Sequence, residues 1–300
     1  MVAEKLFDEV TLRKLEQLRL VAERVRAGAI KGERRSTRRG TSIEFADYRN
    51  YTRGDDLRRL DWNIYARLER PFIKLLEEEE DLAVYILLDA SASMDWPEGR
   101  SGDDAHKFTY GLRLAAGLGH IALTTGDHLT VAALRDDGDL VRGPMRGRGR
   151  SLALLNFLEG VRPSGLTDLD GALRNWARRG NRPGLVILIS DLLSPTGFES
   201  GLNELLGRGY EAAVIQVLSP EETNPPLAGD LSLIDVETRR PQEVTVDGPM
   251  RDLYTSRLLA WREEIAAFCV TRGVHYLMIE TSVPWEALIL YDLRRLRVVR

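Results

Sequence analysis

The chain of 300 residues has few of the features that mark secreted or membrane proteins. It contains one cysteine, Cys269, which cannot form a disulfide within the chain. Its apolar runs are short, and none approaches the roughly 18 residues that a membrane-spanning helix needs. The first ten residues include Glu4, Asp8 and Glu9 and lack the apolar core of a signal peptide. We therefore expect a cytoplasmic protein with no membrane span.

The chain also lacks a large excess of charge of either sign. It has 42 basic and 46 acidic residues, which give a net charge of -4. This balance does not favour a nucleic-acid partner. A basic stretch runs from Arg24 to Arg39, but it has no interleaved aromatic residues on which bases could stack. We expect this stretch to fold over the acidic run from Glu77 to Asp81, or to bind an acidic partner.

The periodicity of apolar residues predicts alternating strands and helices. The predicted strands are 82–88, 128–134, 139–143, 185–190, 211–218 and 274–279. The predicted helices are 11–27, 104–124, 151–160, 168–179, 199–207, 252–272 and 284–297. Because the strands are nearly continuous apolar runs, they indicate an α/β fold with a doubly wound, mostly parallel sheet and helices on both faces.

Two regions depart from this alternation. Residues 1–80 form an amino-terminal arm with a helix, the basic connector and a segment rich in aromatic, Arg and Asp residues, and residues 81–300 form the α/β domain. Proline residues at 219–250 indicate an insertion that carries a hairpin. The aromatic segment 43–67 is either an internal clamp that fastens the arm or an exposed docking surface. We favour the clamp, because buried ionic groups must be paired and this segment supplies the pairs.

Polar side chains follow the apolar strands, at the edge where parallel sheets carry their functional groups. Asp89, Ser91 and Ser93 follow the strand 82–88, and Asp191 follows the strand 185–190. Thr167 lies at the start of the helix 168–179. The alternation of Asp89, Ser91 and Ser93 places their side chains on one side of an extended loop, where they could surround an ion.

The oxygen donors of these five residues include no sulfur or imidazole, which selects a hard divalent cation, Mg²⁺ first and Mn²⁺ or Ca²⁺ next. The pattern resembles the metal-ion-dependent adhesion site of von Willebrand factor A domains. In that family the two serines and the threonine usually contact the ion, and the aspartates act directly or through water. A loop that has these residues but never binds metal is the alternative.

Further motifs narrow the resemblance to the bacterial "domain of unknown function 58" family, which contains a von Willebrand factor A-like domain. These motifs are Gly40-Thr-Ser-Ile-Glu-Phe-Ala-Asp-Tyr-Arg49, Tyr51-x-x-Gly54-Asp55-Asp56-x-Arg58, Asp61-Trp62 and Ala66-Arg67. The resemblance covers nearly the whole chain. It implies a partner or adaptor of AAA+ ATPases of the MoxR type.

The sequence has no P-loop and no nucleophile elbow, and its four histidines show no ligand spacing. The function expected from these observations is a non-enzymatic protein-interaction module that binds a partner's acidic side chain through its metal ion. Two alternatives stay open. One is a metal-dependent hydrolase, for which the sequence offers no clear general base, and the other is a structural domain with a vestigial site.

Overall fold

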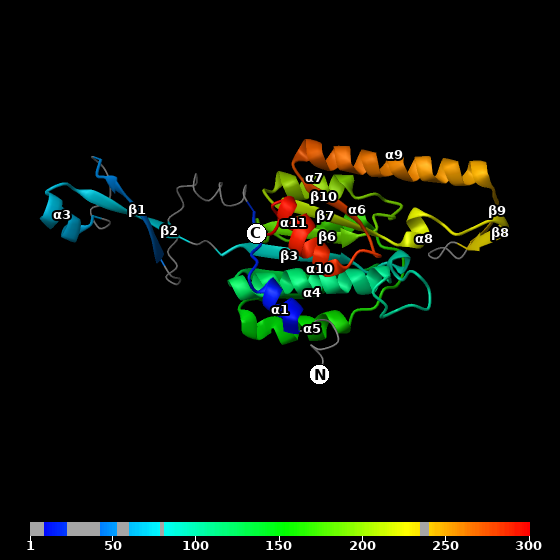
Figure 1. Ribbon diagram of the computed structural model, residues 1–300, viewed down its shortest axis with the longest axis horizontal. Coiled ribbons are helices and arrows are strands. Elements are labelled where there is room, and N and C mark those ends of the chain that lie inside the picture. Colours follow the sequence, from blue (N-terminus) through cyan, green and yellow to red (C-terminus); the bar gives the residue numbers. More distant parts are fainter. Residues whose placement is uncertain (1–8, 23–42, 53–59, 79–80, 235–239) are drawn as a thin grey trace. The chain divides into compact units, whose positions relative to one another are not determined.

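The computed structural model describes residues 9–22, 43–52, 60–78, 81–234 and 240–300 (Figure 1). The chain divides into two compact units. The larger unit consists of Met1–Ala29 and Leu82–Arg300, and the smaller unit consists of Ile30–Asp81. The basic stretch 24–39 lies outside the described residues, and so do residues 79 and 80 of the acidic run.

The smaller unit contains two strands that the sequence did not predict. Strand β1 (Ile43–Asn50) pairs antiparallel with β2 (Phe72–Glu78), and helix α3 (Trp62–Leu68) lies between them in the chain. The register of β1 shifts between Phe45 and Asp47, which interrupts the alternation that would reveal a strand. Helix α3 buries none of its residues. The choice between a clamp and a docking surface stays a prediction.

The larger unit is built on a six-stranded sheet in the order β10-β7-β6-β3-β4-β5. All neighbouring strands are parallel except β4 and β5. The strands are β3 (Ala83–Asp89), β4 (His128–Leu134), β5 (Leu140–Met145), β6 (Leu185–Ser190), β7 (Glu211–Leu218) and β10 (His275–Glu280). The predicted α/β class and mostly parallel sheet are confirmed, and all six strands lie within a few residues of their predicted positions.

Helices cover both faces of this sheet, as predicted (Figure 1). On one face Val84, Ile86 and Leu88 of β3 belong to one buried cluster, and on the other face Tyr85 and Leu87 belong to a second cluster. The helices of the first face are α1 (Glu9–Leu15), α4 (Lys107–Thr125), α5 (Ser151–Glu159) and the short carboxyl-terminal helices α10 (Trp285–Ala287) and α11 (Leu293–Arg295). Those of the second face are α6 (Leu169–Arg178), α7 (Glu199–Gly207) and α9 (Gly248–Arg272). Burial on both faces explains why β3 is a continuous apolar run.

The amino-terminal helix is shorter than predicted. Helix α1 ends at Leu15, and the chain continues without helical structure to residue 22. There Leu20 forms an antiparallel bridge with Val299, and the backbone N–H groups of Arg19 and Arg300 each donate to the other residue's carbonyl oxygen at 2.8 Å. The helical spacing of apolar residues was therefore misleading here. Leu18 and Leu20 are buried, but they lie in a non-helical segment that pairs with the carboxyl-terminal end of the chain.

The insertion carries the hairpin that the sequence predicted. Helix α8 (Pro220–Thr223) is followed by the antiparallel strands β8 (Gly229–Ile234) and β9 (Pro241–Val246). Helix α9 begins at Gly248, four residues earlier than predicted, because Asp247 caps it by accepting a hydrogen bond from the backbone N–H of Met250 at 2.8 Å. None of the described helices combines the length and apolar composition needed to cross a membrane.

The sheet order creates a topological switch point between β3 and β6. The chain leaves β3 through α4 toward β4 on one side, and it leaves β6 through α7 toward β7 on the other side. These connections diverge between the adjacent strands β3 and β6, and such a switch point is where open α/β sheets bind ligands. The last residues of β3 and β6 therefore mark the place to look for a site.

Candidate functional site

The loop after β3 is held in place by backbone hydrogen bonds to two neighbouring segments. The N–H of Ala90 donates to the carbonyl of Leu134 at the end of β4, at 3.0 Å. The N–H of Ala92 donates to the carbonyl of Gly165, at 2.8 Å, and the N–H of Ser164 donates to the carbonyl of Ala90, also at 2.8 Å. The short helix η3 (Ala92–Met94) follows, so Ser91 and Ser93 have fixed backbone positions.

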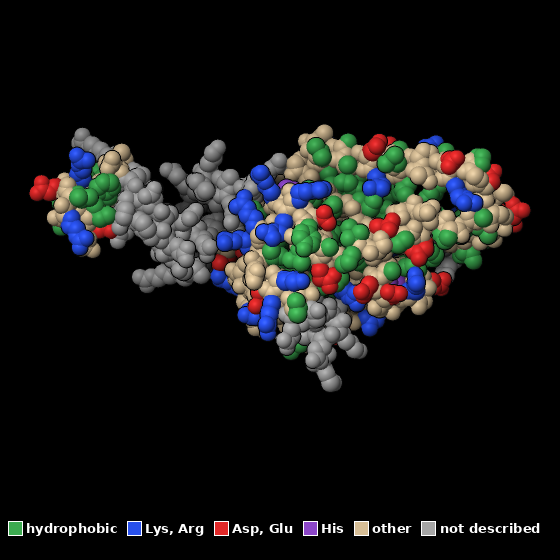
Figure 2. Space-filling model, in the orientation of Figure 1, with side chains coloured by type: hydrophobic (Ala, Val, Ile, Leu, Met, Phe, Trp, Pro, Cys, Tyr) green, Lys and Arg blue, Asp and Glu red, His purple; other side chains and the backbone are tan. Residues whose placement is uncertain are grey.

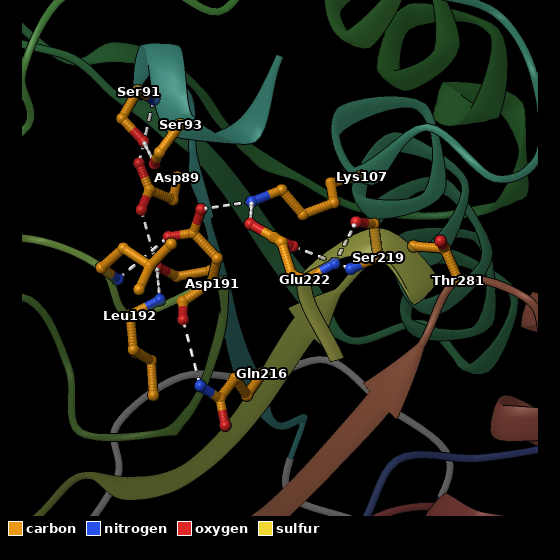
Figure 3. A network of polar contacts seen from close by, with 12 residues as sticks. Asp89, Ser91, Ser93, Lys107, Asp191, Leu192, Gln216, Ser219, Glu222 and Thr281 are labelled. Atoms are coloured by element: carbon orange, nitrogen blue, oxygen red, sulfur yellow. Dashed lines mark hydrogen bonds and ion pairs between the residues drawn. The ribbon is translucent and has the colours of Figure 1, made fainter. Parts of the chain in front are cut away.

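Three of the predicted site residues lie together in this loop (Figure 3). Asp89 is buried, and its Oδ1 accepts a hydrogen bond from the N–H of Ser91 at 3.0 Å. The hydroxyl oxygens of Ser91 and Ser93 are 3.0 Å apart. The carboxylate of Asp89 also receives a hydrogen bond of 2.6 Å from the hydroxyl of Ser190, the last residue of β6.

Asp191 lies in the turn that follows β6, and it is completely buried. Its Oδ1 accepts a hydrogen bond from the N–H of Leu193 at 3.0 Å, and its backbone carbonyl accepts one from the side chain of Gln216 at 3.1 Å. The adjacent Leu192 has a φ of 62°, a left-handed conformation that leucine rarely adopts. Backbone strain of this kind is concentrated at functional sites.

Thr167 is less closely joined to the other four residues. Its side chain is buried, but its hydroxyl donates to the carbonyl of Leu134 at 3.5 Å. The backbone carbonyl of Thr167 accepts a hydrogen bond from the hydroxyl of Ser194 at 2.8 Å, which connects the loop before α6 to the loop after β6. Thr167 thus lies at the same edge of the sheet as the other predicted ligands. Among the described contacts, it forms no hydrogen bond to any of them.

A buried lysine forms an unexpected part of the site. The Nζ of Lys107, the first residue of α4, lies 2.8 Å from Oδ2 of Asp191 and 2.6 Å from Oε1 of Glu222 on α8 (Figure 3). The residues predicted for the site did not include Lys107, Ser190 or Glu222. One local signal was present, because Ser219-Pro-Glu-Glu222 has the spacing of a capping box, which the structure forms.

Burial and charge change the acidity of these groups. Burial raises the pKa of Asp89 to about 6, and the nearby charge of Asp191 acts in the same direction. Burial alone would lower the pKa of Lys107, but the carboxylates of Asp191 and Glu222 outweigh it and hold this pKa above its ordinary value. Burial also raises the pKa of Glu222, although Lys107 opposes the shift. The three carboxylates exceed the single ammonium group, so the site favours an added cation.

The donor set fits a hard divalent cation. Carboxylate and hydroxyl oxygens are the ligands that Mg²⁺ takes, and adjacent ligands of an octahedral Mg²⁺ ion with bonds of about 2.1 Å lie about 3.0 Å apart. The hydroxyls of Ser91 and Ser93 have that separation. Within the described residues there is no cluster of three or more His, Cys, Asp or Glu side chains suited to a metal. A metal at this edge would therefore depend on hydroxyl ligands in addition to carboxylates.

The surface charge agrees in part with this picture. On the visible face of the larger unit, Lys and Arg side chains are most densely gathered at the end where the strands begin (Figure 2). Asp and Glu side chains are spread over the remainder of that face. The basic side chains on this face therefore gather away from the end where the parallel strands finish and the candidate site lies (Figure 2).

These observations define an α/β protein with a doubly wound sheet and a cluster of carboxylate and hydroxyl side chains at its switch point. The chain belongs to the DUF58 family, described as proteins of unknown function, whose model matches residues 47–264. An uncharacterized protein of Mycobacterium tuberculosis is 28% identical over 278 residues, which cover 91% of this chain and 86% of that protein. An uncharacterized protein of Mycobacterium avium is 32% identical over 128 residues, which cover 43% of this chain and 73% of that protein.

Solved structures show weaker similarity. The conserved hypothetical protein BatB from Bacteroides thetaiotaomicron is 15% identical, with a TM-score of 0.42, and the match covers 72% of this chain and 98% of that one. An aerotolerance-related membrane protein from Bacteroides fragilis is also 15% identical, with a TM-score of 0.43 over 71% of this chain and 99% of that one. The fold described above depends on the strand order and core of this chain and not on these matches.

Proposed function

We propose that this chain is a metal-dependent protein-interaction module and not an enzyme. In this proposal Asp89, Ser91 and Ser93 hold a Mg²⁺ ion, with Mn²⁺ or Ca²⁺ as possible substitutes, and Thr167 and Asp191 complete its surroundings. The observation that carries the proposal is the cluster of oxygen donors around the buried Asp89 at the switch point of the sheet. A metal held mainly by neutral hydroxyls keeps enough positive charge to accept a carboxylate from a partner.

The partner that we propose is an AAA+ ATPase of the MoxR type, or a protein on which that ATPase acts, in the cytoplasm. This part follows from the family resemblance. It agrees with the absence of a P-loop from the sequence, since an adaptor of a ring-forming ATPase does not need to hydrolyse nucleotide itself.

Calorimetric titration with MgCl₂ and MnCl₂ tests the metal site. We expect one ion per chain in the wild type and no binding in Asp89→Ala. The exposed Asp136→Ala variant is the matched control, and we expect it to bind like the wild type. Metal binding that is equal in all three proteins, or absent from all three, would contradict the proposed site.

Affinity purification tests the partner. We expect an AAA+ ATPase to copurify with the chain in Mg²⁺, to be lost in EDTA and to be lost from the Asp89→Ala variant. Copurification that EDTA and Asp89→Ala leave unchanged would refute the metal bridge while leaving an adaptor role in place. Hydrolysis of phosphate or carboxylic esters that depends on added Mg²⁺ would instead support a hydrolase.

A further inference from the structure

The buried lysine at the site joins two parts of the larger unit. Lys107 is completely buried, and its ammonium group contacts Asp191 after β6 and Glu222 at the start of the insertion. Asp191 is also completely buried, and the side chain of Glu222 is 20% exposed. A fully buried lysine needs charge partners, and here the two carboxylates supply them.

Further hydrogen bonds fix the backbone of Lys107 and the position of its partner Glu222. The backbone N–H of Lys107 donates to the carbonyl of Trp96 at 2.8 Å, which connects it to the loop that carries Ser93. The N–H of Ser219 donates to Oε2 of Glu222 at 2.8 Å, and the hydroxyl of Tyr254 on α9 donates to the carbonyl of Glu222 at 2.5 Å. The ammonium group is therefore a fixed positive charge between the candidate metal site and the insertion.

Lys107 and a metal ion would use the same carboxylate. Asp191 already accepts a hydrogen bond from Leu193 on Oδ1, and Lys107 takes Oδ2. A divalent cation near Asp89 and Asp191 would lie close to an ammonium group of like charge, and like charges disfavour each other at a buried site. The carboxylate cannot neutralise both cations fully.

From this arrangement we infer that Lys107 is a built-in cation that competes with the metal ion for Asp191, and that it couples metal occupancy to the contact between α4 and α8. The inference rests on the proposed metal site and states how its affinity is set. When metal binds, the bond between Lys107 and Asp191 weakens, and Glu222 becomes the main partner of the lysine. The start of the insertion then responds to the state of the metal site.

Removal of the competing charge tests the inference. We expect Lys107→Met to bind Mg²⁺ and Mn²⁺ at least about tenfold more tightly than the wild type in calorimetric titration. Lys14→Met, which changes an exposed lysine, is the matched control and should bind like the wild type. The double variant Lys107→Met/Glu222→Gln removes one charge of each sign and should also bind more tightly, and it preserves the charge balance that folding requires.

The outcomes separate the inference from the proposed function. If the wild type binds metal and neither lysine variant binds more tightly, the inference is wrong and the metal site stands. If metal binds only after Lys107 is removed, the inference is supported and the native chain is not a metal-dependent module. If no variant binds metal, both are wrong.

A measurement on the wild type covers the case in which the variants do not fold. Hydrogen exchange of the backbone amides in Glu221–Asn224 should become slower when Mg²⁺ is added, because the contact between Lys107 and Glu222 strengthens, and Asp89→Ala should abolish this change. Unchanged exchange in a protein that calorimetry shows to be loaded with Mg²⁺ would overturn the coupling.

Discussion

The hydroxyl of Ser190 donates a hydrogen bond of 2.6 Å to Oδ2 of Asp89, across the boundary between the adjacent strands β6 and β3. The hydroxyl oxygen of Ser190 in turn accepts a hydrogen bond of 2.9 Å from the N–H of Leu192, the residue with a left-handed backbone. Ser190 is completely buried. One serine therefore orients the carboxylate of the candidate metal site and stabilises the turn that carries Asp191.

Replacement of Ser190 should weaken both the fold and the site. Ser190→Ala leaves Oδ2 of Asp89 without its hydroxyl donor and the N–H of Leu192 without an acceptor, so we expect the free energy of unfolding to fall by about 1–3 kcal/mol. Urea denaturation gives this value. Ser256→Ala removes a hydroxyl on the exposed surface of α9, which donates to the carbonyl of Asp252, and should change stability far less. Equal losses in the two variants would contradict the role assigned to Ser190.

The charged carboxylate of Asp89 should lower the free energy of unfolding when no metal is present. Its carboxylate is buried near Asp191, while the ammonium group of Lys107 pairs with Asp191 and Glu222. Its pKa rises from 3.8 to about 6, and one pKa unit corresponds to about 1.4 kcal/mol, so ionising Asp89 in the folded chain costs about 3 kcal/mol more than ionising an ordinary aspartate. Asp89→Asn keeps the shape and removes the charge.

We therefore expect Asp89→Asn to be more stable than the wild type by about 3 kcal/mol at pH 7.5 in EDTA, while losing the Mg²⁺-dependent stabilisation of the wild type. Thermal or urea denaturation with and without MgCl₂ measures both effects. Asp136→Asn changes an exposed aspartate and should alter neither. A less stable Asp89→Asn protein would show that the hydrogen bonds to the carboxylate outweigh its burial.

The elements of the sheet were predictable because burial leaves a local record in the sequence. Strands β3, β6 and β7 are buried at every position, so β3 and β6 read as apolar runs up to their last residue, and β7 reads as one apart from Glu211 and Gln216. Asp89 and Asp191 were predictable for the same reason, since the carboxyl ends of parallel strands share one edge. The site residues that follow these strands needed no knowledge of distant contacts.

The missed features depend on contacts between distant parts of the chain. Lys107 pairs with Asp191 and Glu222, which lie 84 and 115 residues further along, and no local pattern joins them. The direction of the Thr167 hydroxyl is set by the carbonyl of Leu134, 33 residues away. The end of α1 is similar, because pairing with Val299 replaces helix beyond Leu15. Periodicity records which residues are buried, but not what buries them.

His120 should make stability depend on pH. Its ring is buried in α4, with Nδ1 3.1 Å from the hydroxyl of Ser151 and Nε2 3.8 Å from Oε1 of Glu16. Burial lowers the pKa of His120, although Glu16 opposes the shift. The unfolded chain, in which the histidine has an ordinary pKa of about 6.5, therefore takes up this proton first as the pH falls.

The stabilising effect of a neutral His120 is thus fully present above about pH 7 and is lost as the pH falls below about 6.5. We expect the free energy of unfolding of the wild type to decrease between pH 7.5 and pH 5.5, and the decrease to be smaller in His120→Gln. Urea denaturation at several pH values gives the two curves. Curves with the same slope would mean that His120 takes up its proton with the same pKa in the folded and unfolded chains, which would contradict the effect of burial.

Gly184, just before β6, should tolerate no side chain. A Cβ atom at this position would lie 2.0 Å from the carbonyl oxygen of Ala83, at the start of β3. The carbonyl of Gly184 also accepts a hydrogen bond of 2.9 Å from the N–H of Glu211, at the start of β7. The clash is with the backbone of β3, and β7 holds Gly184 on its other side through this hydrogen bond. The overlap therefore cannot be relieved without breaking hydrogen bonds between β6 and one of its two neighbouring strands.

We expect Gly184→Ala to lower the free energy of unfolding by about 1–3 kcal/mol or more, because relief of the overlap must separate β6 from β3. Gly207→Ala is the matched control, since Gly207 ends α7 and a Cβ there meets nothing within 4 Å. It should be neutral or stabilising by up to about 1 kcal/mol. Because the separated strands are those that carry Asp89 and Asp191, Gly184→Ala should also weaken Mg²⁺ binding in calorimetry. A variant that is destabilised yet binds Mg²⁺ as the wild type does would show that the site does not depend on the close pairing of these two strands.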